Sequence, residues 1–139
     1  MLNYENAVMK IKTLLVLLLA CTGMSAFGQD IKFTAQAPEV VGVNEHFKLA
    51  YTINSGDAEN LQVPAFSAFD YSGPSRSSQT SVKIINGNMS REVRVSYSYF
   101  MKPQKTGTFK IGPASIEVDG QTYRSNPVTI KVIQEKQQQ

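Results

Sequence analysis

The chain has 139 residues, which is room for one domain, and its net charge is only +3. The 12 Lys/Arg and 10 Asp/Glu residues that follow residue 28 are interspersed, so the sequence lacks the clustered basic face of a nucleic-acid-binding protein. Its one cysteine, Cys21, lies near the start, and the remainder therefore cannot form an internal disulfide.

Residues 1–28 have the pattern of a secretory signal peptide. Two lysines precede a short apolar run over residues 14–20, and Ala26 and Gly28 then place small residues at the −3 and −1 positions before Gln29. The run is shorter than the roughly 20 apolar residues that cross a bilayer. We therefore expect export, with cleavage between Gly28 and Gln29.

Cys21 gives this leader a second interpretation. Residues 18–21 (Leu-Leu-Ala-Cys) resemble a lipobox, in which the cysteine becomes the lipidated N-terminus of a lipoprotein. The leucine at position 19 fits a lipobox less well than a small residue, so cleavage before Gln29 is the favoured interpretation and lipidation of Cys21 is the alternative. Met9 is a second candidate start of translation.

The sequence after the leader alternates apolar and polar residues, a period of two that is typical of half-buried strands. In residues 45–54 the alternation places Leu49 and Tyr51 on an inward face, and His46 and Lys48 on an outward face. The same pattern predicts further strands over residues 31–35, 81–85, 88–101, 116–118, 121–123 and 128–133.

Two dipeptides between these runs, Asn86-Gly87 and Asp119-Gly120, favour type I′ hairpin turns because both tolerate positive φ angles. A two-residue turn at the first puts Ile84 opposite Met89, a register that gathers apolar residues on one face of a half-buried hairpin. The six prolines are expected between strands or at strand ends, where a missing N–H does least harm.

These elements predict an all-β fold, an immunoglobulin-like antiparallel β-sandwich of about seven strands. We assign it to residues 29–133, after a signal peptide over residues 1–28. The serine-rich stretch 72–81 is interpreted as a solvated edge strand, and the polar residues 134–139 as a tail or linker.

Residues able to carry catalysis are scarce. A Ser-His-Asp arrangement would have to use His46, the one histidine, which is expected on an outward face. A zinc site built from His and Cys has too few ligands after the leader. We predict no enzyme activity and no catalytic, cofactor-binding or metal-binding residues.

Exposed aromatic residues would favour a different function, a carbohydrate-binding or adhesin-like sandwich on the cell envelope. Four rings are candidates for a sugar-stacking platform, namely Phe66, Phe69, Tyr71 and Phe100. A flat platform of rings would favour sugar binding, whereas rings buried under a loop would indicate packing.

A longer pattern covers the second half of the chain, as YSYFMKPQKTGTFKIGP over residues 97–113 and IEVDGQTYRSNPV over residues 116–128. Phe33, VNEHF over residues 43–47, and Phe66 after Pro64 fit the same pattern in the first half. The order and spacing of these segments resemble the N-terminal domain of the BatD family, the oxygen-tolerance proteins of the Bat aerotolerance operon.

This resemblance implies a non-catalytic protein-interaction module in the periplasm or cell envelope of a Gram-negative bacterium. Family members have several β-sandwich domains and a membrane helix further along. They are encoded beside proteins with von Willebrand factor type A domains, with which an envelope complex linked to aerotolerance and oxidative stress is expected. This chain ends after the first module without a later transmembrane helix, so we expect a fragment, a truncated gene product or a soluble relative.

Overall fold

The computed structural model describes residues 4–10 and 29–134, and the leader residues Cys21 and Gly28 lie outside this part. Residues 4–10 are helical and belong to one compact unit, while a second unit begins at Ile31. The strands of the second unit are β1 (Phe33–Gln36), β2 (Val40–Gly42), β3 (Phe47–Ile53), β4 (Ala58–Gln62), β5 (Phe69–Ile85), β6 (Asn88–Pro103), β7 (Gly107–Ile111), β8 (Ser115–Val118), β9 (Gln121–Arg124) and β10 (Val128–Ile133).

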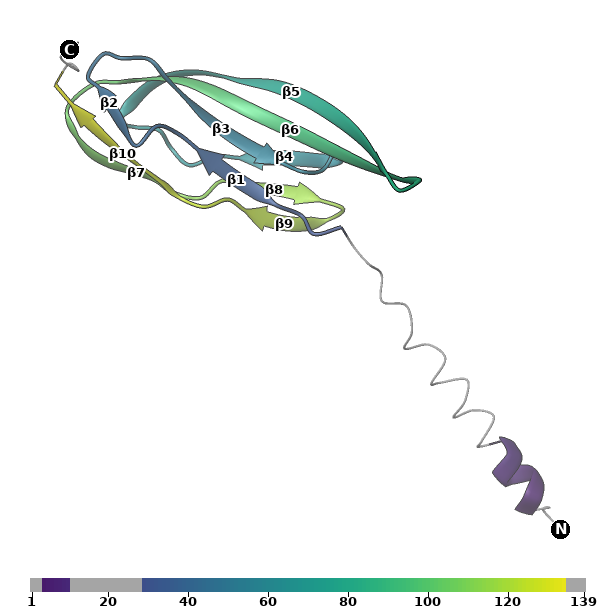
Figure 1. The fold of residues 1–139 in the computed structure, drawn as a ribbon. Helices are drawn as coiled ribbons and strands as arrows, with labels where there is room; N and C mark the ends of the chain where they lie inside the picture. Colours follow the sequence, from purple (N-terminus) through teal and green to yellow (C-terminus); the bar gives the residue numbers. More distant parts are fainter. Residues whose placement is uncertain (1–3, 11–28, 135–139) are drawn as a thin grey trace. The chain divides into compact units, whose positions relative to one another are not determined.

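One layer of the second unit is a four-stranded antiparallel sheet with the order β1-β3-β6-β5 (Figure 1). β1 and β3 alternate between buried and more exposed residues as the sequence predicts. In β3, Leu49 and Tyr51 are fully buried, whereas Lys48, and His46 just before the strand, are exposed. β5 is the edge strand of this sheet, as expected for the serine-rich stretch.

The other layer is built from two chain segments that each break once. β7 and β8 follow each other along one segment, β9 and β10 along the next, and the pairs β7–β10 and β8–β9 are antiparallel. β4 adds to β8 in antiparallel orientation, and β2 adds to β10 in parallel orientation. The breaks fall at residues 112–114 and 125–127, where Pro113 and Pro127 interrupt the ladders.

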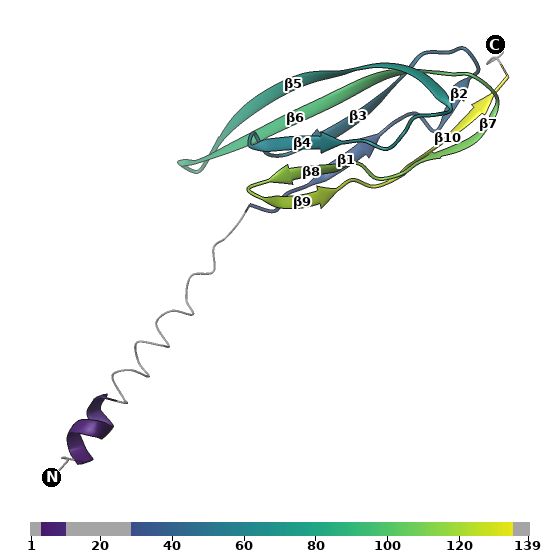
Figure 2. The ribbon, with the colours of Figure 1, turned by 180° about the vertical axis from the view of Figure 1, so that it is seen from behind.

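The two layers enclose one hydrophobic core (Figures 1 and 2). It joins Leu49, Tyr51 and Met101 of the first layer with Ile116 and Ile130 of the second, all with no exposed surface. A four-stranded sheet facing a layer of β4, the β7–β8 segment and the β9–β10 segment is the ABED and CFG arrangement of an immunoglobulin constant-type sandwich, with the breaks dividing two of its strands. The predicted all-β sandwich is confirmed.

Both predicted hairpin turns are present. Asn86 and Gly87 have φ of 52° and 78°, and Asp119 and Gly120 have φ of 50° and 79°, the positive pairs of type I′ turns. The register that they set is also as expected, with Ile84 opposite Met89.

The burial expected for the first hairpin is wrong. β3 ends at Ile53, which pairs with Val95, and beyond that point β6 pairs only with β5. The two strands continue past the ends of β3, β4 and the β8–β9 hairpin (Figures 1 and 2). We call residues 79–94 the arm; its strands extend about 20 Å at 3.3 Å per residue.

Pro74 departs from the expected placement of prolines, because it lies inside β5. The register of β5 shifts between Ser72 and Ser75, so Gly73 and Pro74 together oppose one residue of β6. This is a β-bulge on an edge strand, a place where a proline is tolerated. Gly73 has φ of 115°, and a Cβ there would lie 2.8 Å from the Ser98 carbonyl oxygen, so the bulge requires glycine.

Candidate interaction surfaces

The polar residues of the pattern in residues 43–47 and 116–128 form hydrogen bonds with the backbone of the sandwich. The Asn126 side chain bridges the two layers, because its Oδ1 accepts from the Ala35 N–H at 2.9 Å and its Nδ2 donates to the Ala35 carbonyl at 3.0 Å. The side-chain amide, in the break before β10, thus makes the two hydrogen bonds to β1 that a neighbouring strand would make. It ties the first strand to a residue 91 positions later in the sequence.

Ser125 connects the two breaks of the second layer. Its buried Oγ accepts from the Ala114 N–H at 2.9 Å, and its own N–H donates to the Ala114 carbonyl at 2.9 Å. The hydroxyl also donates to the Asn126 carbonyl at 3.1 Å. These bonds satisfy backbone groups that the interrupted ladders leave unpaired.

Glu45 has a similar role in the turn before β3. Its Oε2 accepts from the Gly42 N–H at 2.8 Å, and its N–H donates to the Gly42 carbonyl at 3.0 Å. Asn44 has a φ of 67° in the same turn, a conformation that asparagine adopts more readily than most residues. The pattern residues of this segment therefore shape a tight turn.

The aromatic candidates for a sugar platform divide into buried and exposed rings. Phe66 and Phe69 are each 5 % exposed, whereas Tyr71 and Phe100 are 56 % and 51 % exposed. Phe66 packs edge-on against Tyr71, with ring centroids 5.0 Å apart, and against Tyr99 at 5.2 Å. This edge-to-face cluster covers the core and does not form a flat stacking surface.

One buried polar atom stands out inside the core. The Tyr51 hydroxyl has no hydrogen-bond partner among the described residues, and its side chain is fully buried. Burial and, second, the neighbouring Tyr99 together raise the pKa of the Tyr51 phenol to about 12, because a phenolate is poorly stabilised there. Burial also raises the pKa of the Tyr99 phenol, with Tyr71 as the second cause.

Two residues that the sequence analysis singles out, His46 and Gln29, lie at the surface. His46 is exposed, and Gln29, the first residue after the expected cleavage point, is exposed at the start of the second described range. Within residues 4–10 and 29–134, no three His, Cys, Asp or Glu side chains lie together as metal ligands. In the same part of the chain, no helix is long and apolar enough to cross a membrane.

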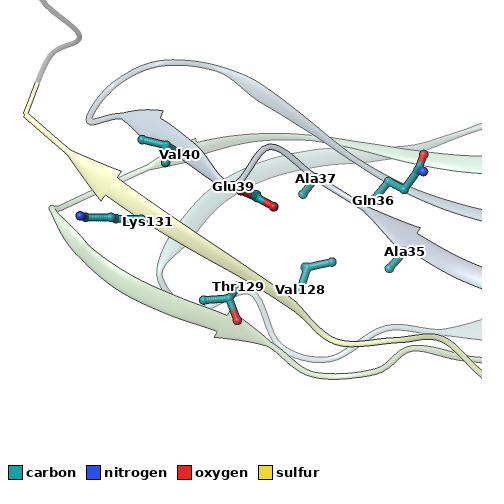
Figure 3. A pocket seen from close by; sticks show the side chains of 8 residues that line it. All are labelled: Ala35, Gln36, Ala37, Glu39, Val40, Val128, Thr129 and Lys131. Atoms are coloured by element: carbon teal, nitrogen blue, oxygen red, sulfur yellow. The ribbon is translucent and has the colours of Figure 1, made fainter.

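An open groove of about 690 Å³ lies where the chain passes from the first layer to the second (Figure 3). Its walls come from the end of β1, from β2 and the link between them, and from β10, with residues Ala35, Gln36, Ala37, Glu39, Val40, Val128, Thr129 and Lys131. The backbone N–H of Lys131 donates to the Glu39 carbonyl at 2.8 Å. The groove combines apolar walls with one acidic and one basic side chain.

The arm is the second prominent surface. Its inner face continues the core face of β6, and its outer face continues the outer face of the four-stranded sheet. Four large apolar side chains of the arm are more than half exposed, namely Val82 at 56 %, Ile84 at 71 %, Ile85 at 64 % and Met89 at 73 %. Sequence reasoning identified the hairpin and its apolar face but missed this exposure.

The fold and these surfaces define an immunoglobulin-like β-sandwich domain with two exposed features, a groove between its layers and a projecting hairpin. Residues 34–132 match the family model described as the BatD DUF11 like domain. The match covers more than half of the chain, which therefore belongs to the BatD family, a family of cell-envelope proteins. No curated protein sequence shows significant similarity to the chain.

Proposed function

We propose that this domain is a non-catalytic, periplasmic protein-interaction module of a cell-envelope complex linked to aerotolerance and oxidative stress. One observation carries this proposal: the polar residues of the BatD-like pattern, Glu45, Ser125 and Asn126, are bonded to backbone groups. A catalytic centre needs its polar groups directed at a substrate. Here they stabilise a scaffold, which supports a function that resides in exposed surfaces.

The groove of Figure 3 is the surface that we assign to a protein partner. It is open to solvent, unlike the enclosed pockets that bind most small molecules. Apolar side chains flanked by Glu39 and Lys131 suit a polypeptide segment that supplies both apolar contacts and charges. Burial of Phe66 and Phe69 gives the alternative, a carbohydrate-binding sandwich, less support.

We further propose that the partner is a von Willebrand factor type A domain protein encoded beside this one. The test is calorimetric titration of residues 29–139 with each such protein, purified separately. Val40→Asp places a charge in the groove and should weaken binding about tenfold, as loss of a central apolar contact does. Thr122→Asp adds the same charge on an exposed position of β9 and should leave the affinity unchanged.

Two outcomes would contradict this proposal. The first is that none of the neighbouring proteins binds. The second is that Val40→Asp and Thr122→Asp weaken binding equally, which would remove the groove as the contact surface.

A further inference from the structure

The end of the arm is apolar on both of its faces. Ile84 and Met89 form a directly opposed pair on the inner face, and Ile85, opposite Asn88, lies on the outer face. All three apolar side chains are more than 60 % exposed, so they add little to the stability of the isolated domain. The tip therefore presents exposed apolar side chains on both of its faces.

Positive charge lies directly behind the tip, again on both faces. Lys83, opposite Ser90, is on the outer face, and Arg91, opposite Val82, is on the inner face. The one acidic residue of the arm, Glu92, forms an ion pair with Arg94 at 3.2 Å, which offsets its charge. Lys83 and Arg91, which we call the collar, thus give the arm a net positive charge behind its apolar tip.

The first strand of the sandwich begins at the end from which the arm projects. Phe33 at the start of β1 pairs with Ile53, which pairs with Val95 at the base of the arm. Cys21 precedes Phe33 by 12 positions, a length of chain that spans up to about 40 Å when extended, against about 20 Å for the arm. Lipid on Cys21, the alternative to cleavage before Gln29, would tether the chain to a membrane by a segment long enough for the tip of the arm to reach that membrane.

We propose that the tip of the arm docks on an anionic lipid surface. Ile84, Ile85 and Met89 enter the interfacial region from both faces of the hairpin, and Lys83 and Arg91 interact with phosphate groups of the lipids. A second copy of this chain fits less well, because two arms in contact would bring their positive collars together. The inference goes beyond the proposed protein interaction, since it concerns another surface and another class of ligand.

The test is co-sedimentation of residues 29–139 with vesicles of phosphatidylethanolamine and phosphatidylglycerol, and with vesicles of phosphatidylcholine. These residues contain every core side chain of the sandwich. We expect binding to the anionic vesicles that is lost in Ile84→Ser/Met89→Ser. Lys83→Gln/Arg91→Gln should weaken this binding roughly thirtyfold, because each basic side chain near an anionic surface strengthens binding roughly fivefold.

Lys48→Gln/Lys110→Gln is the matched control, because it removes the same charge from exposed positions outside the arm. It should bind vesicles like the unchanged protein, and circular dichroism should show all variants folded. Equal binding to both vesicle types, an equal effect of the control, or no binding at all would overturn the proposal. So would a dimer that Ile84→Ser/Met89→Ser dissociates without any effect on vesicle binding, which would assign the tip to a second copy.

Discussion

Leu49 and His46 lie three positions apart at the start of β3 but in opposite environments. Leu49 has no exposed surface, whereas His46 is exposed. Leu49→Ala should therefore lower the free energy of unfolding by about 2–5 kcal/mol, the range for large-to-small changes in a core. His46→Ala should change it by about 0.5 kcal/mol or less. Urea denaturation measures both, and equal losses would contradict the alternation on which the sandwich prediction is based.

Tyr51→Phe is a core substitution that should raise stability, because the Tyr51 hydroxyl has no hydrogen-bond partner among the described residues. Tyr51→Phe removes a buried polar atom without a hydrogen-bond partner and leaves the ring contacts with Phe33 and Tyr99 in place. We expect the variant to be more stable by about 1 kcal/mol in urea denaturation at neutral pH. A loss of stability would show that the hydroxyl has a partner in solution.

The same residue predicts a pH dependence at alkaline pH. The pKa of Tyr51 is raised to about 12 in the folded state, against 10.0 in an unfolded chain. Between these values the unfolded chain loses the phenolic proton and the folded one keeps it, so stability is retained below pH 10 and falls as pH rises toward 12. The slope from one such group is about 1.4 kcal/mol per pH unit.

Tyr51→Phe is the control for this dependence, because it lacks the titrating group. Its unfolding free energy should fall less steeply than that of the unchanged protein above pH 10. Tyr99, whose pKa is also raised, still contributes in both proteins. Parallel curves for the two proteins over this range would refute the assignment to Tyr51.

Asn126 is the residue of the BatD-like pattern whose structural role can be measured most directly. Asn126→Ala removes both hydrogen bonds to Ala35 and leaves two backbone groups of β1 without partners. The expected loss of unfolding free energy is about 1–3 kcal/mol. Asn88→Ala, at an exposed position next to the hairpin turn, is the matched control and should be nearly neutral. If the two variants lost equal stability, Asn126 would not be a link between the layers.

At the scale of elements, the arm should contribute to binding and not to folding. Deleting residues 82–85 and 88–91 joins Ser81 and Glu92 through the Asn86-Gly87 turn. The deletion keeps the strand register, because Ser81 and Glu92 are already opposed and an even number of residues is removed from each strand. The removed side chains are exposed, so the melting temperature should change by no more than about 4 °C. A larger decrease would show that the arm packs on the sandwich in solution.

The comparison of sequence with structure is clearest for these elements. Strands with strict alternation, such as β3 and β10, were predicted, and so were both hairpins with their positive-φ turns. β2, β4 and β7 were missed, because they are three to five residues long and only partly buried, which leaves too little alternation to recognise.

The candidate surfaces were less predictable, and the reason is physical. Alternation shows that Ile84 and Met89 share a face, but whether that face is covered depends on where β3 and the second layer end. The groove depends on where the chain crosses between layers, after β1, and no local pattern encodes that crossing. Residues 125–127 could be recognised from the sequence as part of a BatD-like pattern. Their role in linking backbone segments became visible only in the hydrogen bonds of the structure.

For the whole molecule, folding should be independent of the leader. Every buried side chain of the core lies between Phe33 and Val132, within the unit that begins at Ile31. Residues 29–139 should therefore melt within about 2 °C of the full chain, since a difference of 1 kcal/mol would move the midpoint of a domain this size by about 4 °C or more. A decrease of several degrees would mean that residues 1–28 stabilise the sandwich. N-terminal sequencing of the protein from the producing cell tests the leader itself: we expect Gln29 as the first residue, whereas a lipidated Cys21 would identify a lipoprotein.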